Sequence, residues 1–175
     1  MKDFKEVKTV QTVRYSSGKT KFGNVLVIFT EQGICGVTLM GSKDSIHNYL
    51  KKMYPDAIIE KDEGNHQYIG GIVKAIDGSH QDFTFDIHGT EFQMKVWDAI
   101  SKIPYGSTMT YSQIAEKIGR PKAVRSVANA CGKNPVPIII PCHRVIRKSG
   151  DLGGYGLGIH VKKQLLDHEK SLMEM

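Results

Sequence analysis

A cysteine lies directly beside a histidine in Pro141-Cys142-His143-Arg144, which follows the proline-containing run 134–140. A cysteine acts as a nucleophile only as its thiolate, and a nearby histidine held by a carboxylate is a common way to form that thiolate near neutral pH. Glu169, in the last segment with helically spaced apolar residues, is the candidate carboxylate. A Cys-His dipeptide alone is equally consistent with a buried, inert thiol, so the neighbouring residues must decide.

The positive charge of the chain is confined to the half that contains Cys142. Residues 1–88 carry 11 Lys and Arg against 11 Asp and Glu, whereas residues 89–175 carry 13 against 7, which accounts for the net charge of +6. A charge surplus is usually only a solvated face. Its confinement to one half favours a polyanionic partner such as nucleic acid.

The cysteine spacing and the lack of long apolar runs limit the other possibilities. Cys35, Cys131 and Cys142 are widely separated, which predicts neither a disulfide framework nor a zinc knuckle. No run approaches the roughly 18 apolar residues of a membrane span, and the polar start is not a signal peptide. We therefore expect no membrane contact and a cytoplasmic protein, associated with the nucleoid in a prokaryote or nuclear in a eukaryote.

The first half alternates strand and helix patterns. Helices are predicted over Asp44–Met53, which Pro55 follows, and over Tyr68–Ile76. Strands are predicted over Thr9–Tyr15, Asn24–Thr30, Gly33–Leu39 and Phe83–Ile87. A hairpin-rich α/β domain over residues 1–88 is expected.

The second half, residues 89–175, begins with two helices that carry the same start signal. Thr90 with Gln93, and Thr110 with Gln113, are capping-box patterns, so helices are expected to about Lys102 and to Gly119. Trp97 is expected to anchor the core. A further helix is predicted from Pro121, in the favoured first position, to Gly132. Two short helices joined by a tight turn indicate a helix-turn-helix unit.

The last of these helices has two distinct faces at 100° per residue. One face is polar and contains a single arginine, Arg125, beside Lys122, Ser126 and Asn129. Such a face suits close approach to a nucleic-acid groove, although an exposed Arg is more often simply solvated. The opposite, inward face is expected to contain Val124, Val127, Ala128 and Cys131, which makes Cys131 a poor nucleophile.

A glycine-rich segment, residues 147–158, follows the Cys-His pair and is expected to form a loop that lines a pocket. A closing helix with Val161, Leu165 and Leu166 is expected to end near Glu169.

Together these residues resemble the O6-alkylguanine-DNA alkyltransferases, also called methylated-DNA–protein-cysteine methyltransferases. The resemblance runs from Gly89 to about Glu169, while the first half agrees in coarse layout only. The motifs, in the family's order and spacing, are Phe92-Gln93 with Val96-Trp97, Pro121-Lys122-Ala123-Val124-Arg125, Asn134-Pro135-Val136-Pro137, Ile140-Pro141-Cys142-His143-Arg144-Val145 and Leu165-Leu166-x-x-Glu169. The implied fold class is α+β: an N-terminal ribonuclease-H-like α/β domain, then a C-terminal helical domain of winged-helix and helix-turn-helix type.

The resemblance implies that Cys142 accepts an alkyl group from O6 of guanine, and less readily from O4 of thymine. The reaction is irreversible and needs no cofactor, so each protein molecule reacts once. His143, oriented by Glu169, would take the thiol proton through a water, because neighbouring side chains of an extended segment point to opposite faces. Asn134 resembles the residue that shapes the turn between the helix and the active site.

The resemblance also implies how a monomer would bind duplex DNA. The target base must be flipped out of the helix, with Arg125 filling the vacated space and Tyr111 meeting the rotated phosphate. The helix that carries Arg125 would lie in the minor groove. The other implied DNA-binding residues are Ser112, Arg120, Ala123, Ser126 and Lys148, and the implied pocket residues are Tyr111, Pro137, Val145, Tyr155, Gly156 and Leu157.

Two positions depart from the family pattern. Some members bind a structural zinc in the first domain through Cys and His, but Cys35 is the only cysteine before residue 131, so no metal is carried over. Leu157 stands where several members have a small residue, and it is expected to crowd bulky adducts such as benzyl.

Three alternatives compete with this interpretation. A helix-turn-helix regulator would explain the charge and helices but not the Pro-Cys-His-Arg segment or Glu169. A Cys-His hydrolase would turn over many times, whereas an alkyltransferase stops after one event. The alkyltransferase-like proteins that only bind lesions lack the cysteine, and Cys142 argues against them.

Overall fold

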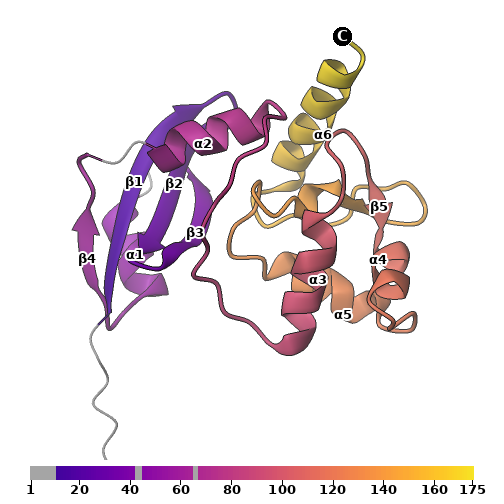
Figure 1. Ribbon diagram of the computed structural model, residues 1–175, viewed down its shortest axis with the longest axis horizontal. Coiled ribbons are helices and arrows are strands. Elements are labelled where there is room, and N and C mark those ends of the chain that lie inside the picture. The colour runs from indigo at the N-terminus through magenta and orange to yellow at the C-terminus, as the bar shows by residue number, and fades with distance from the viewer. Residues whose placement is uncertain (1–10, 42–44, 65–66) are drawn as a thin grey trace, which may run out of the picture.

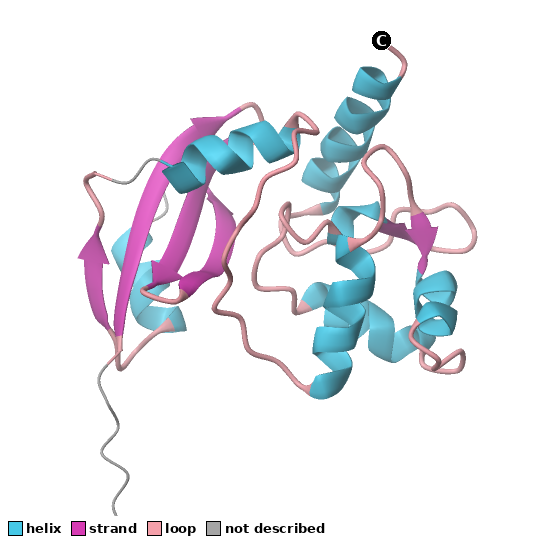
Figure 2. Cartoon of the chain, in the orientation of Figure 1, coloured by secondary structure: helices cyan, strands magenta, loops and turns pink. Residues whose placement is uncertain are grey.

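The computed structural model describes residues 11–41, 45–64 and 67–175. Two groups of elements lie side by side: a sheet with two helices, and a set of helices that carries Cys142 (Figure 1). Most strands belong to the first half and most helices to the second (Figure 2). The α+β class predicted from the sequence is confirmed.

The sheet has the strand order β3-β2-β1-β4. β1 (Thr12–Thr20), β2 (Gly23–Thr30) and β3 (Gly33–Met40) are antiparallel, and β4 (Ile58–Lys61), which was not predicted, pairs parallel with β1. The hairpin prediction is confirmed, but β1 continues five residues beyond Tyr15, because its backbone stays paired with β2 where the apolar alternation has ended. The predicted start of this strand, Thr9, lies outside the described residues.

One helix packs on each face of the sheet, because alternate residues of β2 point in opposite directions. Val25, Val27 and Phe29 share a core cluster with Ile72 of α2 (Gln67–Ile76). Leu26 and Ile28 pack with Leu50 of α1 (Ile46–Met53). Both helices were predicted; α1 begins after its cap Ser45, and the predicted first residue Asp44 lies outside the described part of the chain.

The predicted strand Phe83–Ile87 is wrong. Only Phe85 forms a β-bridge, to Ile34 of β3, flanked by hydrogen bonds from Ile34 N–H to Thr84 O (2.8 Å) and from Asp86 N–H to Ile34 O (2.9 Å). Farther along β3, Val37 N–H donates instead to Pro135 O of the second half, at 2.9 Å. The edge of β3 is therefore shared between two segments, and residues 83–87 cannot extend the sheet.

The second half begins with three helices: α3 (Glu91–Ser101), α4 (Tyr111–Lys117) and α5 (Val124–Gly132). Both predicted capping boxes are present, at Thr90 and Thr110. Trp97 of α3 is buried and its Nε1–H donates to Ala130 O of α5 at 2.9 Å, so the predicted anchor is confirmed.

The predicted start of α5 at Pro121 is wrong. Ala123 N–H donates to Arg120 O at 2.8 Å, which closes a turn and delays the helix to Val124. As the first residue of the helix, Val124 is 37% exposed, not buried as predicted, and Ala128 is only half-buried. Ala130, which was not predicted, is buried with Val127 and Cys131. The polar face is exposed as expected.

The segment with Cys142 is not extended, contrary to the expectation. It forms the 3-10 turn η1 (Cys142–Arg144), because Cys142 N–H bonds Ile140 O (2.8 Å) and Arg144 N–H bonds Pro141 O (2.9 Å). β6 (Val145–Ile146) follows and pairs parallel with β5 (Met109–Thr110). Residues 147–158 form the expected loop.

The chain closes with α6 (Ile159–Met173), which continues one turn beyond the predicted end at Glu169. The largest hydrophobic cluster joins the two halves, since Val27 and Ile34 of the sheet share it with Val96 and Ile100 of α3. Among the described residues, no helix has the length and apolar character needed to cross a membrane.

The cap of α3 gives a stability prediction. Thr90 Oγ1 accepts from Gln93 N–H at 3.2 Å, so Thr90→Ala should lower the free energy of unfolding by about 1 kcal/mol. Thr90→Ser keeps the acceptor and should cost much less. Urea unfolding of the three proteins measures both differences, and equal losses for Ala and Ser would contradict the capping role.

Candidate active site

The Cys142 sulfur is buried, with 5% of the residue exposed, and is held by one side chain. Asn134 Nδ2 donates to Cys142 Sγ at 3.1 Å and to Ile140 O at 2.8 Å. The other end of this amide is fixed because Val136 N–H donates to Asn134 Oδ1 at 3.0 Å. Asn134 thus orients the sulfur and ties together the two ends of the 134–142 segment, as the resemblance implied for this turn.

Burial raises the pKa of the Cys142 thiol, while the Asn134 hydrogen bond and the positive charge of Lys162 act in the opposite direction. The resting sulfur is therefore a protonated thiol. A nucleophilic thiolate forms here only when a neighbouring base removes the proton.

The structure brings His143 and Glu169 together, as predicted. His143 Nε2 lies 2.6 Å from Glu169 Oε1, and both side chains are almost completely buried. An ionised carboxylate can only accept, so Nε2 carries the hydrogen in this pair. Nδ1 is then the basic nitrogen, and it is buried without a hydrogen-bond partner among the described residues. This nitrogen is free to accept a proton.

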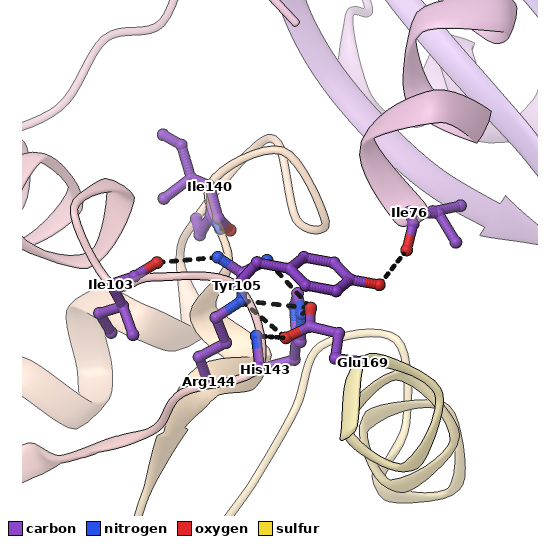
Figure 3. Close-up of polar contacts among 9 residues, drawn as sticks. Ile76, Ile103, Tyr105, Ile140, His143, Arg144 and Glu169 are labelled. Atoms are coloured by element: carbon purple, nitrogen blue, oxygen red, sulfur yellow. Dashed lines mark hydrogen bonds and ion pairs between the residues drawn. The ribbon is translucent and has the colours of Figure 1, made fainter. Parts of the chain in front are cut away.

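Arg144 joins His143 at the Glu169 carboxylate, a contact that the sequence interpretation missed. Its guanidinium donates to both oxygens of Glu169, through Nε at 2.9 Å and Nη2 at 3.0 Å, and through Nη1 to Ile103 O at 2.8 Å. Figure 3 shows Arg144 and His143 converging on the carboxylate from one side of α6. In the sequence Arg144 stood out only as the residue after Cys-His. Its bidentate pairing with Glu169 left no local signal, because the two residues are 25 positions apart.

These contacts set the protonation states. Burial alone would raise the pKa of the Glu169 carboxyl, but hydrogen bonds and charge from His143 and Arg144 lower it to about 2. Burial lowers the pKa of His143, although Glu169 acts against that shift. At neutral pH the site therefore holds an ionised Glu169 and a neutral His143, which is the form that can act as a base.

Lys162 is a second residue that sequence analysis missed. Its ammonium is fully buried and donates to the carbonyls of Val145 (2.6 Å), Leu152 and Gly154. It therefore fastens the glycine-rich loop to β6 beside Cys142. The lysine stands on α6 among other charged residues, and nothing in its local spacing predicts burial.

Cys142 lines two cavities. We call the first the tyrosine cavity; its volume is about 390 Å³, and Tyr111, Tyr155 and Gly156 line it with Cys142. We call the second the strand cavity; its volume is about 350 Å³, and Pro137, Gly156 and Leu157 line it with Cys142 and the β3 edge. Val145, a predicted pocket residue, is fully buried and lines neither, because β5 and α6 cover it.

The predicted DNA-binding residues lie mainly on α4, on α5 and in the segment between them. Arg120, Arg125, Ser126 and Lys148 are exposed, the last of these on the loop after β6. Tyr111, Ser112 and Ala123 are half-buried, with Tyr111 at the start of α4 beside the glycine-rich loop. Their roles stay predictions.

The other two thiols are poorly suited to nucleophilic chemistry. Burial raises the pKa of Cys131 to about 12. Burial also raises the pKa of Cys35 in β3, whose sulfur lies 3.7 Å from the Tyr54 hydroxyl. Neither has a histidine hydrogen-bonded to it in the described structure.

Comparison with known proteins agrees with this geometry. Residues 91–171 match the family model described as "6-O-methylguanine DNA methyltransferase, DNA binding domain". The inducible methylated-DNA–protein-cysteine methyltransferase of Bacillus subtilis is 41% identical over 142 residues, which cover 77% of this chain and 79% of that protein. The chain belongs to the methylated-DNA–protein-cysteine methyltransferase family.

Two further relatives define the extent of the match. The crystal structure of Mycobacterium tuberculosis OGT in complex with DNA has a TM-score of 0.77 and 34% identity, and the match covers 91% of this chain and 94% of that one. The "Bifunctional transcriptional activator/DNA repair enzyme Ada" of Escherichia coli is 41% identical over 160 residues, 90% of this chain. The chain spans only 45% of that longer protein.

The buried carboxylate predicts a specific response to acid. The folded pKa of Glu169 lies below its ordinary value of 4.5, so its stabilising contribution is present above pH 4.5 and is lost as pH falls towards 2. At pH 7, Glu169→Gln should lower the free energy of unfolding by about 3–5 kcal/mol, because Arg144 loses its partner. This deficit should shrink progressively below pH 4.5, as followed by urea unfolding across pH.

The matched control is Asp167→Asn, which removes an exposed carboxylate from the same helix. It should change the free energy of unfolding little between pH 7 and pH 2, because exposed ion pairs contribute little to stability. A Glu169→Gln deficit that stayed constant from pH 7 to pH 2 would contradict the assigned ionisation.

Proposed function

We propose that this protein repairs DNA by direct reversal of damage. It transfers a methyl or other alkyl group from O6 of guanine, and less readily from O4 of thymine, to the sulfur of Cys142. The observation that carries the proposal is the pair of contacts Asn134–Cys142 and His143–Glu169. They orient a buried thiol, and the next residue offers a basic nitrogen that no described residue hydrogen-bonds. Family membership supports the same reaction.

The reaction follows from the protonation states of the site. A water bridges the Cys142 thiol and His143 Nδ1, and the thiol proton passes through it to the imidazole. The thiolate then attacks the alkyl carbon in line with the leaving oxygen: the S–C bond forms, the C–O6 bond breaks, and its electron pair stays on guanine. The imidazolium returns the proton to guanine through solvent, so His143 ends neutral. The thioether has no route back to a thiol, and the protein reacts once.

Duplex DNA containing the alkylated base is the partner that fits this chemistry. The reacting atom is inside the base stack, so the nucleotide must be extruded, at a cost of a few kcal/mol. Arg125 is exposed on α5 and is the residue proposed to fill the gap, while Tyr111 meets the rotated phosphate. The crystal structure of the Mycobacterium tuberculosis relative in complex with DNA supports DNA as the partner. The protein is proposed to act as a monomer.

The finer fold assignment is part of the proposal. Residues 1–88 are assigned to a ribonuclease-H-like domain, which is supported by three antiparallel strands with a parallel β4 at the edge. Residues 89–175 are assigned to a winged-helix and helix-turn-helix domain, supported by α3–α5 with the small β5-β6 pair.

The nucleophile can be identified directly. After incubation with duplex carrying radiolabelled O6-methylguanine, label should appear on the peptide with Cys142, at no more than one methyl per chain. Cys142→Ser should abolish labelling, because a serine hydroxyl is not ionised in this site. In Cys35→Ser and Cys131→Ser the label should still reside on Cys142. Repeated turnover, or label on another cysteine, would reject the alkyltransferase mechanism in favour of a hydrolase or a misassigned site.

Base extrusion can be tested by comparing two substrates. If Arg125 fills the stack, Arg125→Ala should slow repair of duplex DNA at least about tenfold more than reaction with free O6-methylguanine, since a free base needs no extrusion. Lys122→Ala removes a charge from the turn before α5 and should lack this selectivity. Equal losses on both substrates for Arg125→Ala would identify a structural role instead.

A further inference from the structure

The turn after α3 connects the end of α2 to the Glu169 carboxylate. The Tyr105 hydroxyl donates to Ile76 O, in the last turn of α2, at 2.8 Å. The next residue, Gly106, donates its N–H to Glu169 Oε2 at 3.0 Å. Figure 3 shows the Tyr105 side chain reaching from this turn to α2. One turn therefore contacts the first half through a side chain and the carboxylate through its backbone.

The Tyr105 ring also lies against Arg144. The central carbon of the guanidinium is 5.2 Å from the ring centroid, so the cation faces the π-electrons of the ring. Side chains do not fill all the space beside this pair, because both residues line a cavity of about 410 Å³. The ring and the Ile103 carbonyl therefore restrain the guanidinium on Glu169 where close packing does not.

A second contact joins the end of α2 to α6. The Asp77 carboxylate lies 2.9 Å from Nε2 of His168, the residue before Glu169, and Lys21 donates to the same carboxylate oxygen at 2.6 Å. The His168 ring also meets the Phe22 ring edge-on. Asp77 and Lys21 are each 44% exposed, so this ion pair restrains α6 only weakly. The contact through Tyr105 is the stronger of the two.

We propose, on the basis of the proposed function, that Tyr105 is a positioning residue for the alkyl transfer. It carries the position of α2 to the Arg144–Glu169 pair, and this pair orients His143 as the base. The first half of the protein then contributes to the rate of the chemical step, although none of its described residues hydrogen-bonds the Cys142 sulfur or the His143 ring.

The protonation of His143 gives this role a measurable signature. Burial lowers the pKa of His143, Glu169 acts against that shift, and the charges of Arg144 and Lys162 add to it. The neighbouring Tyr155 is uncharged, since burial raises the pKa of its hydroxyl well above the usual value. If Arg144 moves away from the carboxylate, its lowering effect weakens and the pKa of His143 rises. Because the neutral imidazole is the base, the acid limb of the pH–rate profile then moves to higher pH.

Single-turnover methyl transfer from duplex DNA containing O6-methylguanine is measured across DNA concentration and pH. Tyr105→Leu removes both contacts of the side chain, whereas Tyr105→Phe removes only the hydroxyl bond to α2. Tyr68→Leu is the matched control. It also removes a half-buried tyrosine ring, but that ring packs on Phe29 of the sheet.

If Tyr105 positions the base, Tyr105→Leu should lower the maximal rate about tenfold while the half-saturating DNA concentration stays within about twofold of wild type. Its acid limb should lie at higher pH. Tyr105→Phe should fall between Tyr105→Leu and wild type, and Tyr68→Leu should match wild type. A maximal rate and pH profile for Tyr105→Leu equal to those of Tyr68→Leu would overturn the proposal.

The Glu169→Gln background separates positioning from a general effect on the fold. The carboxylate that Tyr105 positions is absent there, so adding Tyr105→Leu should slow transfer less than about twofold further. A further loss as large as in wild type would show that Tyr105 acts independently of Glu169 and would also overturn the proposal. Failure of wild type to transfer methyl at all would instead reject the proposed function.

Discussion

The buried carboxylate of Glu169 is the interaction on which the site depends. It accepts from His143, from two nitrogens of Arg144 and from Gly106 N–H at 3.0 Å. A buried charge is tolerable only when it is paired and fully hydrogen-bonded, and here the guanidinium supplies the compensating charge. Because these donors come from η1 and from the turn after α3, one carboxylate fixes two segments relative to α6. The position of the Cys-His pair is thus a consequence of satisfying Glu169.

The same face of α6 carries a second buried charge of opposite sign. Lys162 precedes Glu169 by seven residues, two helical turns, so both side chains point inward on either side of Leu165. Glu169 holds the segment before β6, whereas Lys162 holds β6 and the glycine-rich loop after it. Burial raises the pKa of the Cys142 thiol, and the positive charge of Lys162 acts against that shift. A helix that looks polar in sequence therefore holds the segments before and after Cys142 in place. It does so with two buried charges of a kind that surface helices normally expose.

Local signals in the sequence predicted local structure well. Capping boxes fixed the starts of α3 and α4, and the 100° periodicity identified the exposed face that contains Arg125. The predictions of secondary structure failed where contacts with other segments of the chain determine the backbone conformation. Residues 83–87 alternate like a strand, but the neighbouring edge is occupied by Pro135, and Cys142 begins a turn because of carbonyls in the preceding segment. The partners of Arg144 are likewise distant in sequence, so the motif around Cys142 did not show that Arg144 compensates the charge of Glu169.

The two halves of the chain differ in net charge but share one hydrophobic core. The first half has no net charge, so it adds little attraction for a polyanion, yet it shares the largest hydrophobic cluster with α3 and α5. It also holds the site from two directions. The Tyr105 hydroxyl donates to Ile76 O of α2 at 2.8 Å, and the Arg144 guanidinium lies over the Tyr105 ring. At β3, Val37 N–H donates to Pro135 O, in the segment that precedes Cys142. A neutral sheet domain placed this way can shape the space around the sulfur while the positive charge stays on the second half of the chain.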